Sequence, residues 1–234
     1  MIGFKPLFWP TLFTLPAILV LAGLGFWQLE RRVEKRALLD EVAARMAAPI
    51  ADLPADIADP EALKFRPVRA SGVFLHDKEI HLLAPDPNGR SGYQIITPLR
   101  RDDGSYVLVN RGWVPQENRD AATRLAGQVE GKVTIAGLAR PAWPRRLFVP
   151  ENVPEKNFWF FGDLDAMAKA AGLTNYAPVF LEADATPNPD GLPIGGQTRI
   201  TFPNDHLQYA ITWFGLGAAL IVIYFLYHRS RGRL

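Results

Sequence analysis

The sequence predicts a membrane protein in which two transmembrane helices flank a mainly antiparallel β domain, barrel-like or sandwich-like, in an α+β arrangement. Two uncharged apolar runs, each about one bilayer long, lie near the two ends of the 234-residue chain. Between them, short runs of β-branched and aromatic residues alternate with turn residues, as is typical of strands. This middle part is long enough to bury one sizeable core.

The second apolar run is the clearer of the two. Residues 207–227 carry no charge, and as a helix they span ~31 Å, about the thickness of a hydrocarbon core. Residues 228–234 follow and contain three arginines. We expect a transmembrane helix over 207–227 and a basic tail over 228–234 on the cytoplasmic side, because short cytoplasmic segments are rich in Lys and Arg.

The first apolar run, residues 7–29, predicts the other transmembrane helix. Pro10 and Pro16 lie in its first half, where membrane helices tolerate proline better than soluble helices do. A cleaved signal peptide is the alternative, with a passable cleavage site at Ala22. However, the run continues to Trp27, which is long for a signal sequence.

Two spans place both termini on one side and the domain of residues 30–205 on the other. The arginines of the tail favour a cytoplasmic tail and a periplasmic domain. Arg31, Arg32, Lys35 and Arg36 at the end of the first span argue for the reverse, but long domains translocate with little regard to charge. The absence of an Arg- and Ser-rich transit peptide favours a bacterial inner membrane over a mitochondrial one.

Within the domain, residues 30–48 are expected to continue the first helix, and Pro49 ends it. Residues 52–60 are interpreted as a linker. The strongest hairpin signal is Asp103-Gly104 between two apolar runs. Strands are expected at 65–74, 79–83, 93–99, 106–113, 132–140, 158–161, 179–183 and 198–202, and short helices at 117–126 and 164–171.

Composition excludes several classes of function. The chain has no cysteine, which removes disulfides, thiol catalysis and thiolate metal sites. A net charge of +2 without a basic-aromatic repeat gives no reason to expect nucleic-acid binding. No nucleophile elbow, phosphate loop or dinucleotide motif is present, and the four histidines lack metal-ligand spacing. We therefore expect no catalytic activity.

His206 is the candidate binding residue, because it lies one residue before the second span. On a helix, its face also carries Ala210, Trp213, Gly217, Leu220 and Tyr224, all within ~40° of its direction. An ionisable group at the end of a span is a site hypothesis by default, and neutral imidazole is a common axial ligand of haem iron. The alternative is an interfacial histidine that only hydrogen-bonds near the lipid head groups.

Arginines near the spans and on expected strands form a second candidate set, because arginine binds carboxylates bidentately. Surface ion pairing with the acids of the domain is the competing interpretation for each of them. The set comprises Arg31, Arg66, Arg69, Arg111 and Arg199.

Short motifs in a fixed order give the chain a family resemblance. They are Gly25-Phe26-Trp27-Gln28-Leu29, Arg66-Pro67-Val68, Gly72-x-Phe74-x-His76, Val109-Asn110-Arg111-Gly112-Trp113-Val114-Pro115, Phe148-Val149-Pro150-Glu151-Asn152, Gly195-Gly196-Gln197-Thr198-Arg199, and Asn204-Asp205-His206-Leu207-Gln208-Tyr209. Between two terminal spans, this series resembles the Surfeit locus 1 family of cytochrome oxidase assembly proteins, nearly end to end.

The resemblance implies an assembly factor for haem-copper terminal oxidases that binds haem a and aids its delivery to subunit I. It implies His206 as the axial ligand of the haem iron. Trp213 and Trp27 are then expected to line the ring, and Gly217 to make room for it. One or more of Arg31, Arg66 and Arg199 is expected to hold the propionates. Arg111-Gly112-Trp113 is expected to secure a turn and the core.

Subunit I and the lipid bilayer are the expected partners, with haem a synthase as a further candidate. The competing function is a haem-free membrane scaffold that stabilises subunit I while other factors insert haem. A haem-modifying enzyme is the third reading, which the lack of redox or hydrolytic motifs disfavours. The expected client is either a cytochrome c oxidase or a quinol oxidase.

Overall fold

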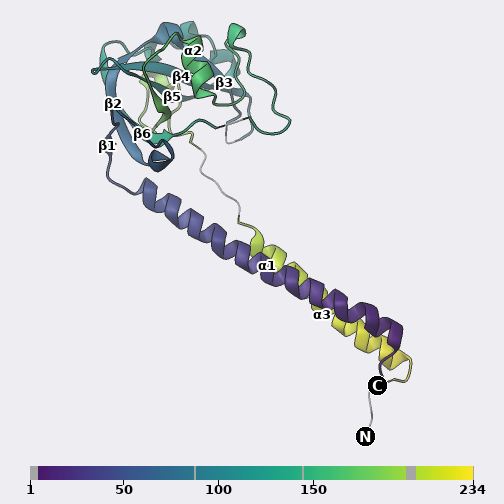
Figure 1. Cartoon of the computed structure of the whole chain (residues 1–234). Helices are drawn as coiled ribbons and strands as arrows, with labels where there is room; N and C mark the ends of the chain where they lie inside the picture. Colours follow the sequence, from purple (N-terminus) through teal and green to yellow (C-terminus); the bar gives the residue numbers. More distant parts are fainter. Residues whose placement is uncertain (1–4, 87, 144, 199–203, 234) are drawn as a thin grey trace. The chain divides into compact units, whose positions relative to one another are not determined.

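The computed structural model describes residues 5–86, 88–143, 145–198 and 204–233. The chain divides into two compact units, each considered by itself here. The helical unit comprises Met1–Glu41 and Thr201–Leu234, and the barrel unit comprises Val42–Ile200. Figure 1 shows the elements of both units along the chain.

Helix α1 (Phe8–Met46) is one uninterrupted helix of 39 residues. Pro10 lies in its first turn, where a backbone N–H has no helical partner in any case, and Pro16 is tolerated inside the helix. Beyond Leu29 the helix continues through Glu, Arg, Leu and Ala residues, all good helix formers. The expected extension of the first helix is thus confirmed as far as Met46, two residues short of the expected end.

Helix α3 (His206–Ser230) packs antiparallel against the first part of α1. Side-chain contacts join Gln28 to His206 near one end and Thr11 to Tyr224 near the other. Both helices are long and apolar enough to cross a membrane, and only 11% of each apolar window is buried. They are therefore candidate membrane spans and differ from the buried core helix of a soluble protein.

The barrel unit contains a closed barrel of five strands, which confirms the mainly antiparallel β architecture. The strands are β2 (Pro67–Phe74), β4 (Gly92–Arg101), β5 (Tyr106–Pro115), β6 (Lys132–Arg140) and β7 (Tyr176–Ala183). Their order is β2-β6-β7-β5-β4, and a β2–β4 pairing closes the ring. Within the ring only β5 and β7 pair in parallel. Strand β3 (Ile80–Leu83) pairs antiparallel with β4, and β1 (Ala51–Asp52) pairs in parallel with β2.

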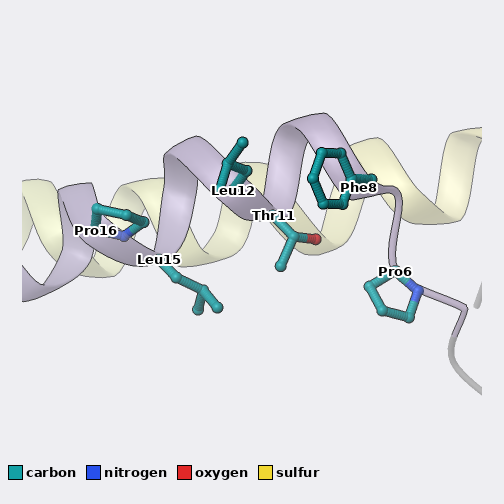
Figure 2. A pocket seen from close by; sticks show the side chains of 6 residues that line it. All are labelled: Pro6, Phe8, Thr11, Leu12, Leu15 and Pro16. Carbon is teal, nitrogen blue, oxygen red and sulfur yellow. The ribbon is translucent and has the colours of Figure 1, made fainter.

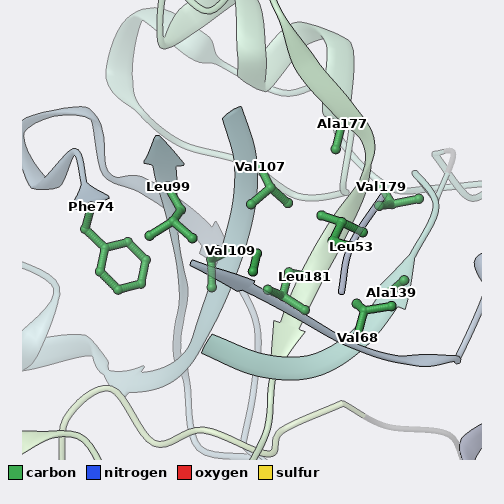
Figure 3. Packing of buried hydrophobic residues seen from close by; sticks show 11 residues of the cluster. Leu53, Val68, Phe74, Leu99, Val107, Val109, Ala139, Ala177, Val179 and Leu181 are labelled. Atoms are coloured by element: carbon green, nitrogen blue, oxygen red, sulfur yellow. The ribbon is translucent and has the colours of Figure 1, made fainter. Parts of the chain in front are cut away.

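Two clusters of apolar side chains fill the inside of the barrel and one part of its outside. Figure 3 shows the first cluster, in which Val107 and Val109 of β5 meet Leu99 and Leu181. Leu108 points to the other side, where it joins the second cluster under helix α2 (Leu164–Ala170). Alternate residues of β5 are thus buried on both faces, which explains its nearly continuous apolar sequence.

Three of the elements expected in the domain are not found as expected. The strand at 158–161 is wrong, because Trp159 forms only an isolated bridge with Leu82 while its side chain enters the second cluster. The helix at 117–126 is wrong in type, since two 3₁₀ turns, Gln116–Asn118 and Ala121–Gly127, replace it. The strand at 198–202 lies almost entirely outside the described residues.

The closure of the barrel predicts a sensitive glycine. Gly72 pairs with Val133 on one side and with Arg101 on the other, and an added Cβ would lie 2.1 Å from the Arg100 carbonyl oxygen. We expect Gly72→Ala to lower the free energy of unfolding by about 3 kcal/mol, because backbone must move to relieve the overlap. Denaturant unfolding of the purified protein in detergent measures this.

Gly23→Ala is the matched control, since an added Cβ at Gly23 meets nothing within 4 Å. A loss at Gly72 no larger than the change at Gly23 would contradict the β2–β4 closure.

Candidate functional site

His206 begins α3 and is held by a glutamine of α1. Its Nδ1 lies 2.7 Å from Oε1 of Gln28, which is 9% exposed. A carboxamide oxygen can only accept, so His206 Nδ1 carries the proton and donates it. When the ring is neutral, the other ring nitrogen, Nε2, then keeps its lone pair.

This tautomer is the one that suits a metal ligand. In the part of the chain that the structure describes, Nε2 of His206 has no hydrogen-bond partner, and the side chain is only half buried. Ligating histidines typically donate their second ring N–H to an oxygen, which fixes the ring and raises its basicity. The donor set at His206 thus fits a haem iron approaching Nε2.

The three residues expected to line or admit the haem ring differ in exposure. Trp27 is half exposed, and Trp213 is half buried. Gly217 is buried, and an added Cβ there would lie 3.8 Å from Leu21 Cβ. The face of α3 that carries Gly217 thus lies against α1, and the space between Gly217 and Leu21 is about the size of one methyl group, so a haem ring at this level would require the helices to separate.

Sequence reasoning did not identify the contacts that join the helices beside His206. The Phe214 ring packs into the space over Gly25, where a Cβ would lie 2.6 Å from the ring, and meets Phe26 edge-on at 5.3 Å between centroids. Gln28 and Gly25 belong to a motif already noted in the sequence, but their partners are about 180 residues away. The sequence signals for these contacts were a glycine, Gly25, and a polar amide, Gln28, within an otherwise apolar span.

The three arginines expected to hold propionates are distributed over both units. Arg31 is exposed and forms an ion pair with Glu34 one turn away, at 2.5 Å. Arg66 is exposed at the start of β2 in the barrel unit. Arg199 lies outside the described residues. Their role toward a carboxylate ligand stays a prediction.

Two further arginines of the sequence set have structural partners. Arg69 forms an ion pair with Asp52 at 2.6 Å, and this raises the pKa of the guanidinium. Arg111 is buried, and burial lowers its pKa to about 10. Its Nη2 donates to the carbonyl of Gly127 and to Asn188 Oδ1.

Gly112 and Trp113 complete the expected structural motif. Gly112 has φ +125° and lies against the Ile194 carbonyl, where a Cβ would be 2.0 Å away. Trp113 is 3% exposed, and its Nε1 donates to the carbonyl of Ala84. The expectation that Arg111-Gly112-Trp113 secures the core is confirmed, but the three residues lie within strand β5 and not in a turn.

The far end of the helix pair carries a second polar contact and an apolar pocket. Nε2 of His228 accepts from the Leu7 backbone N–H at 3.0 Å, and Thr11 bonds to Tyr224 at 2.7 Å. A pocket of about 470 Å³ lies along this part of α1. Figure 2 shows the side chains that line it, Leu12 and Pro16 among them. None of the predicted site residues that the structure describes lines this pocket.

The barrel unit buries one complete charged cluster. Arg124 forms a two-point ion pair with Glu79, and the Nη1–Oε2 distance is 2.9 Å. His81 bonds to the same carboxylate at 2.9 Å, and its Nδ1 accepts from Arg119 Nε at 3.1 Å. Every charge here has a partner, so the cluster fastens the 3₁₀ segment to β3.

Comparison with known proteins places this fold and helix pair in a family. Residues 15–218 match the SURF1 family. Surfeit locus protein 1 of Rattus norvegicus is 42% identical over 218 residues, which cover 87% of this chain and 70% of the relative. The human protein of the same name is 41% identical over 219 residues, covering 87% and 72%. The SURF1-like protein of Monosiga brevicollis is 38% identical over 224 residues, covering 90% and 84%.

Identity at this level over most of both chains, with the matched region running from within α1 to within α3, is decisive. The chain belongs to the SURF1 family.

Proposed function

We propose that this protein binds haem a in the membrane and aids its delivery to subunit I of a haem-copper terminal oxidase. The SURF1 family consists of cytochrome oxidase assembly factors, which implies a non-catalytic role. The observation that supports haem binding is the Gln28–His206 hydrogen bond, since it holds the imidazole in the tautomer that ligates iron.

Each residue contributes a physical function in this proposal. Gln28 orients the His206 ring and keeps the proton on Nδ1, so that the lone pair of Nε2 is free to bind a metal. Bound haem supplies the iron that Nε2 coordinates. A single protein ligand suits a carrier, because release requires only one bond to break. Trp213 and Trp27 would flank the ring, and Arg31, Arg66 or Arg199 would meet the propionates.

The proposed location is a bacterial inner membrane crossed twice, with both termini in the cytoplasm and the barrel in the periplasm. The two apolar helices support membrane anchoring. The three arginines after Tyr227 support a cytoplasmic tail. In this orientation His206 lies at the outer surface of the membrane.

A haem-free scaffold for subunit I is the second candidate. The position of Gly217 favours it, because the space between Gly217 and Leu21 admits little more than a methyl group at the level where a haem ring was expected. In that case the barrel and helices would hold subunit I while other factors insert haem.

Complementation of a strain that lacks the protein tests the proposal. We expect His206→Ala to reduce the haem a content of assembled oxidase to near that of the deletion strain, because the iron loses its ligand. Gln208→Ala, exposed in the same turn of α3, should restore wild-type levels. Full restoration by His206→Ala, with subunit I still co-purifying, would overturn the carrier and support the scaffold.

A further inference from the structure

The loop between β6 and α2 carries two large apolar side chains at its tip. Leu147 is 84% exposed and Phe148 is 93% exposed. Figure 1 shows this segment running outside the barrel. Exposed apolar residues that stand singly are common, but two neighbours at this level of exposure call for an occupant.

The tip is a formed turn. The backbone N–H of Val149 donates to the Arg146 carbonyl at 3.1 Å, which closes a β-turn with Leu147 and Phe148 at its two central positions. Phe148 has φ +66°, and Leu147 has no positive φ, so the turn is of type II. This position normally takes glycine, and a phenylalanine there is strained. Backbone strain of this kind is concentrated at functional positions of proteins.

Side chains on both sides hold the turn in place. Arg145 Nε donates to the Val149 carbonyl at 2.5 Å, and the same guanidinium forms an ion pair with Glu151. At the base of the loop, Trp143 packs 5.0 Å from the Phe180 ring. Asn152 Oδ1 accepts from the Phe160 N–H at 2.8 Å. These contacts fix the conformation of the loop, so that the turn holds Leu147 and Phe148 exposed.

The chemistry of the tip fits a lipid head-group region. Leu and Phe are the side chains that enter the boundary between head groups and acyl chains, and adjacent arginines pair with lipid phosphates. Arg146 is exposed and, among the described residues, has no acidic partner. The candidate membrane span α3 also follows the barrel closely in the sequence. Seven residues, 199–205, separate Thr198 from the start of α3, and a chain of that length spans at most about 30 Å.

We propose that the turn Arg146–Val149 inserts Leu147 and Phe148 into the surface of the bilayer that holds α1 and α3. Arg146 contacts lipid phosphate beside them. This inference depends on membrane anchoring, and it does not depend on haem binding.

A site-specific label tests the proposal, because the chain has no cysteine. The full-length Leu147→Cys protein is labelled with an environment-sensitive fluorophore and placed in nanodiscs of equal parts phosphatidylcholine and phosphatidylglycerol. We expect a blue-shifted emission that lipids spin-labelled near the head group quench. A label at Leu125→Cys, where the native side chain is 70% exposed, should report water.

Phe148→Gly, added to the Leu147→Cys protein, provides the second variant, since glycine accepts the positive φ without strain. We expect unchanged or higher thermal stability, together with loss of the blue shift of the label at position 147. A label at position 147 that reports water in nanodiscs, with Phe148 in place, would overturn the proposal. So would shielding that appears only after purified subunit I is added, because the tip would then belong to a protein interface.

Discussion

Replacing Glu79 by alanine is expected to lower the free energy of unfolding of the barrel by about 3–5 kcal/mol, because removing one partner of a buried ion pair leaves the other charge buried alone. Arg124 is 4% exposed and makes its two-point contact with this carboxylate. His81 also loses its bond to the carboxylate. Denaturant unfolding followed by tryptophan fluorescence measures the change.

Two controls separate the ion pair from a general effect of mutation. Glu130→Ala removes an exposed acid of the same unit and should change stability little. Glu79→Leu combined with Arg124→Met should be less damaging than Glu79→Ala, because no charge is left unpaired. A Glu79→Ala effect as small as that of Glu130→Ala would contradict the buried pair.

The same pair gives a pH dependence of defined sign. Burial raises the pKa of the Glu79 carboxyl, but hydrogen bonds from His81 and Arg124 outweigh burial and hold that pKa below its usual value. A lowered carboxyl pKa contributes stability above the ordinary value of about 4.3, and the contribution is lost as the pH falls through the lowered pKa. The difference between wild type and Glu79→Ala should therefore shrink in acid.

Replacing Gln28 by leucine is expected to weaken haem binding by about 10- to 100-fold, the usual effect of removing the group that orients a ligating histidine. Leucine cannot accept a hydrogen bond from Nδ1–H of His206, so the ring loses both its fixed tautomer and its orientation. Haem titration of the purified protein, followed by absorption, measures the affinity.

The protein without haem provides an independent readout. Nitrogen NMR of labelled histidine should show His206 protonated at Nδ1 in wild type and a mixture of tautomers in Gln28→Leu. Gln28→Glu keeps an acceptor and should keep the Nδ1-protonated form. If the tautomer changes but haem affinity does not, the hydrogen bond stands and the ligand role of His206 fails. An unchanged tautomer in Gln28→Leu would contradict the hydrogen bond itself.

Local patterns in the sequence predicted the elements well wherever one short segment determines its own structure. Asp103-Gly104 forms the β4–β5 turn, with Gly104 at φ +80°. Strand β6 has the expected bounds, 132–140, and polar and apolar residues alternate over its first four positions. The long α1 follows from its helix-forming composition.

Contacts between distant residues were beyond local patterns. The β2–β4 pairing closes the barrel, and β5 pairs in parallel with β7. In both cases the paired strands are separated in the sequence by other elements, so no single turn signal predicts the pairing. Arg124 has non-helical φ and ψ within its 3₁₀ segment and bonds to Glu79, which explains why the regular helix expected there does not form. Phe148 occupies a glycine conformation that no propensity predicts. At the site, His206 was identified from its place before the span, whereas Gln28 became visible only when α1 and α3 were packed together.

One absorption spectrum tests the central claim most directly. Wild type and His206→Ala are each co-expressed with haem a synthesis, purified in detergent and compared at equal protein concentration. The account predicts a haem a spectrum in wild type and loss of most of it in His206→Ala, with both proteins equally folded. Equal haem occupancy and identical spectra in the two proteins would contradict it.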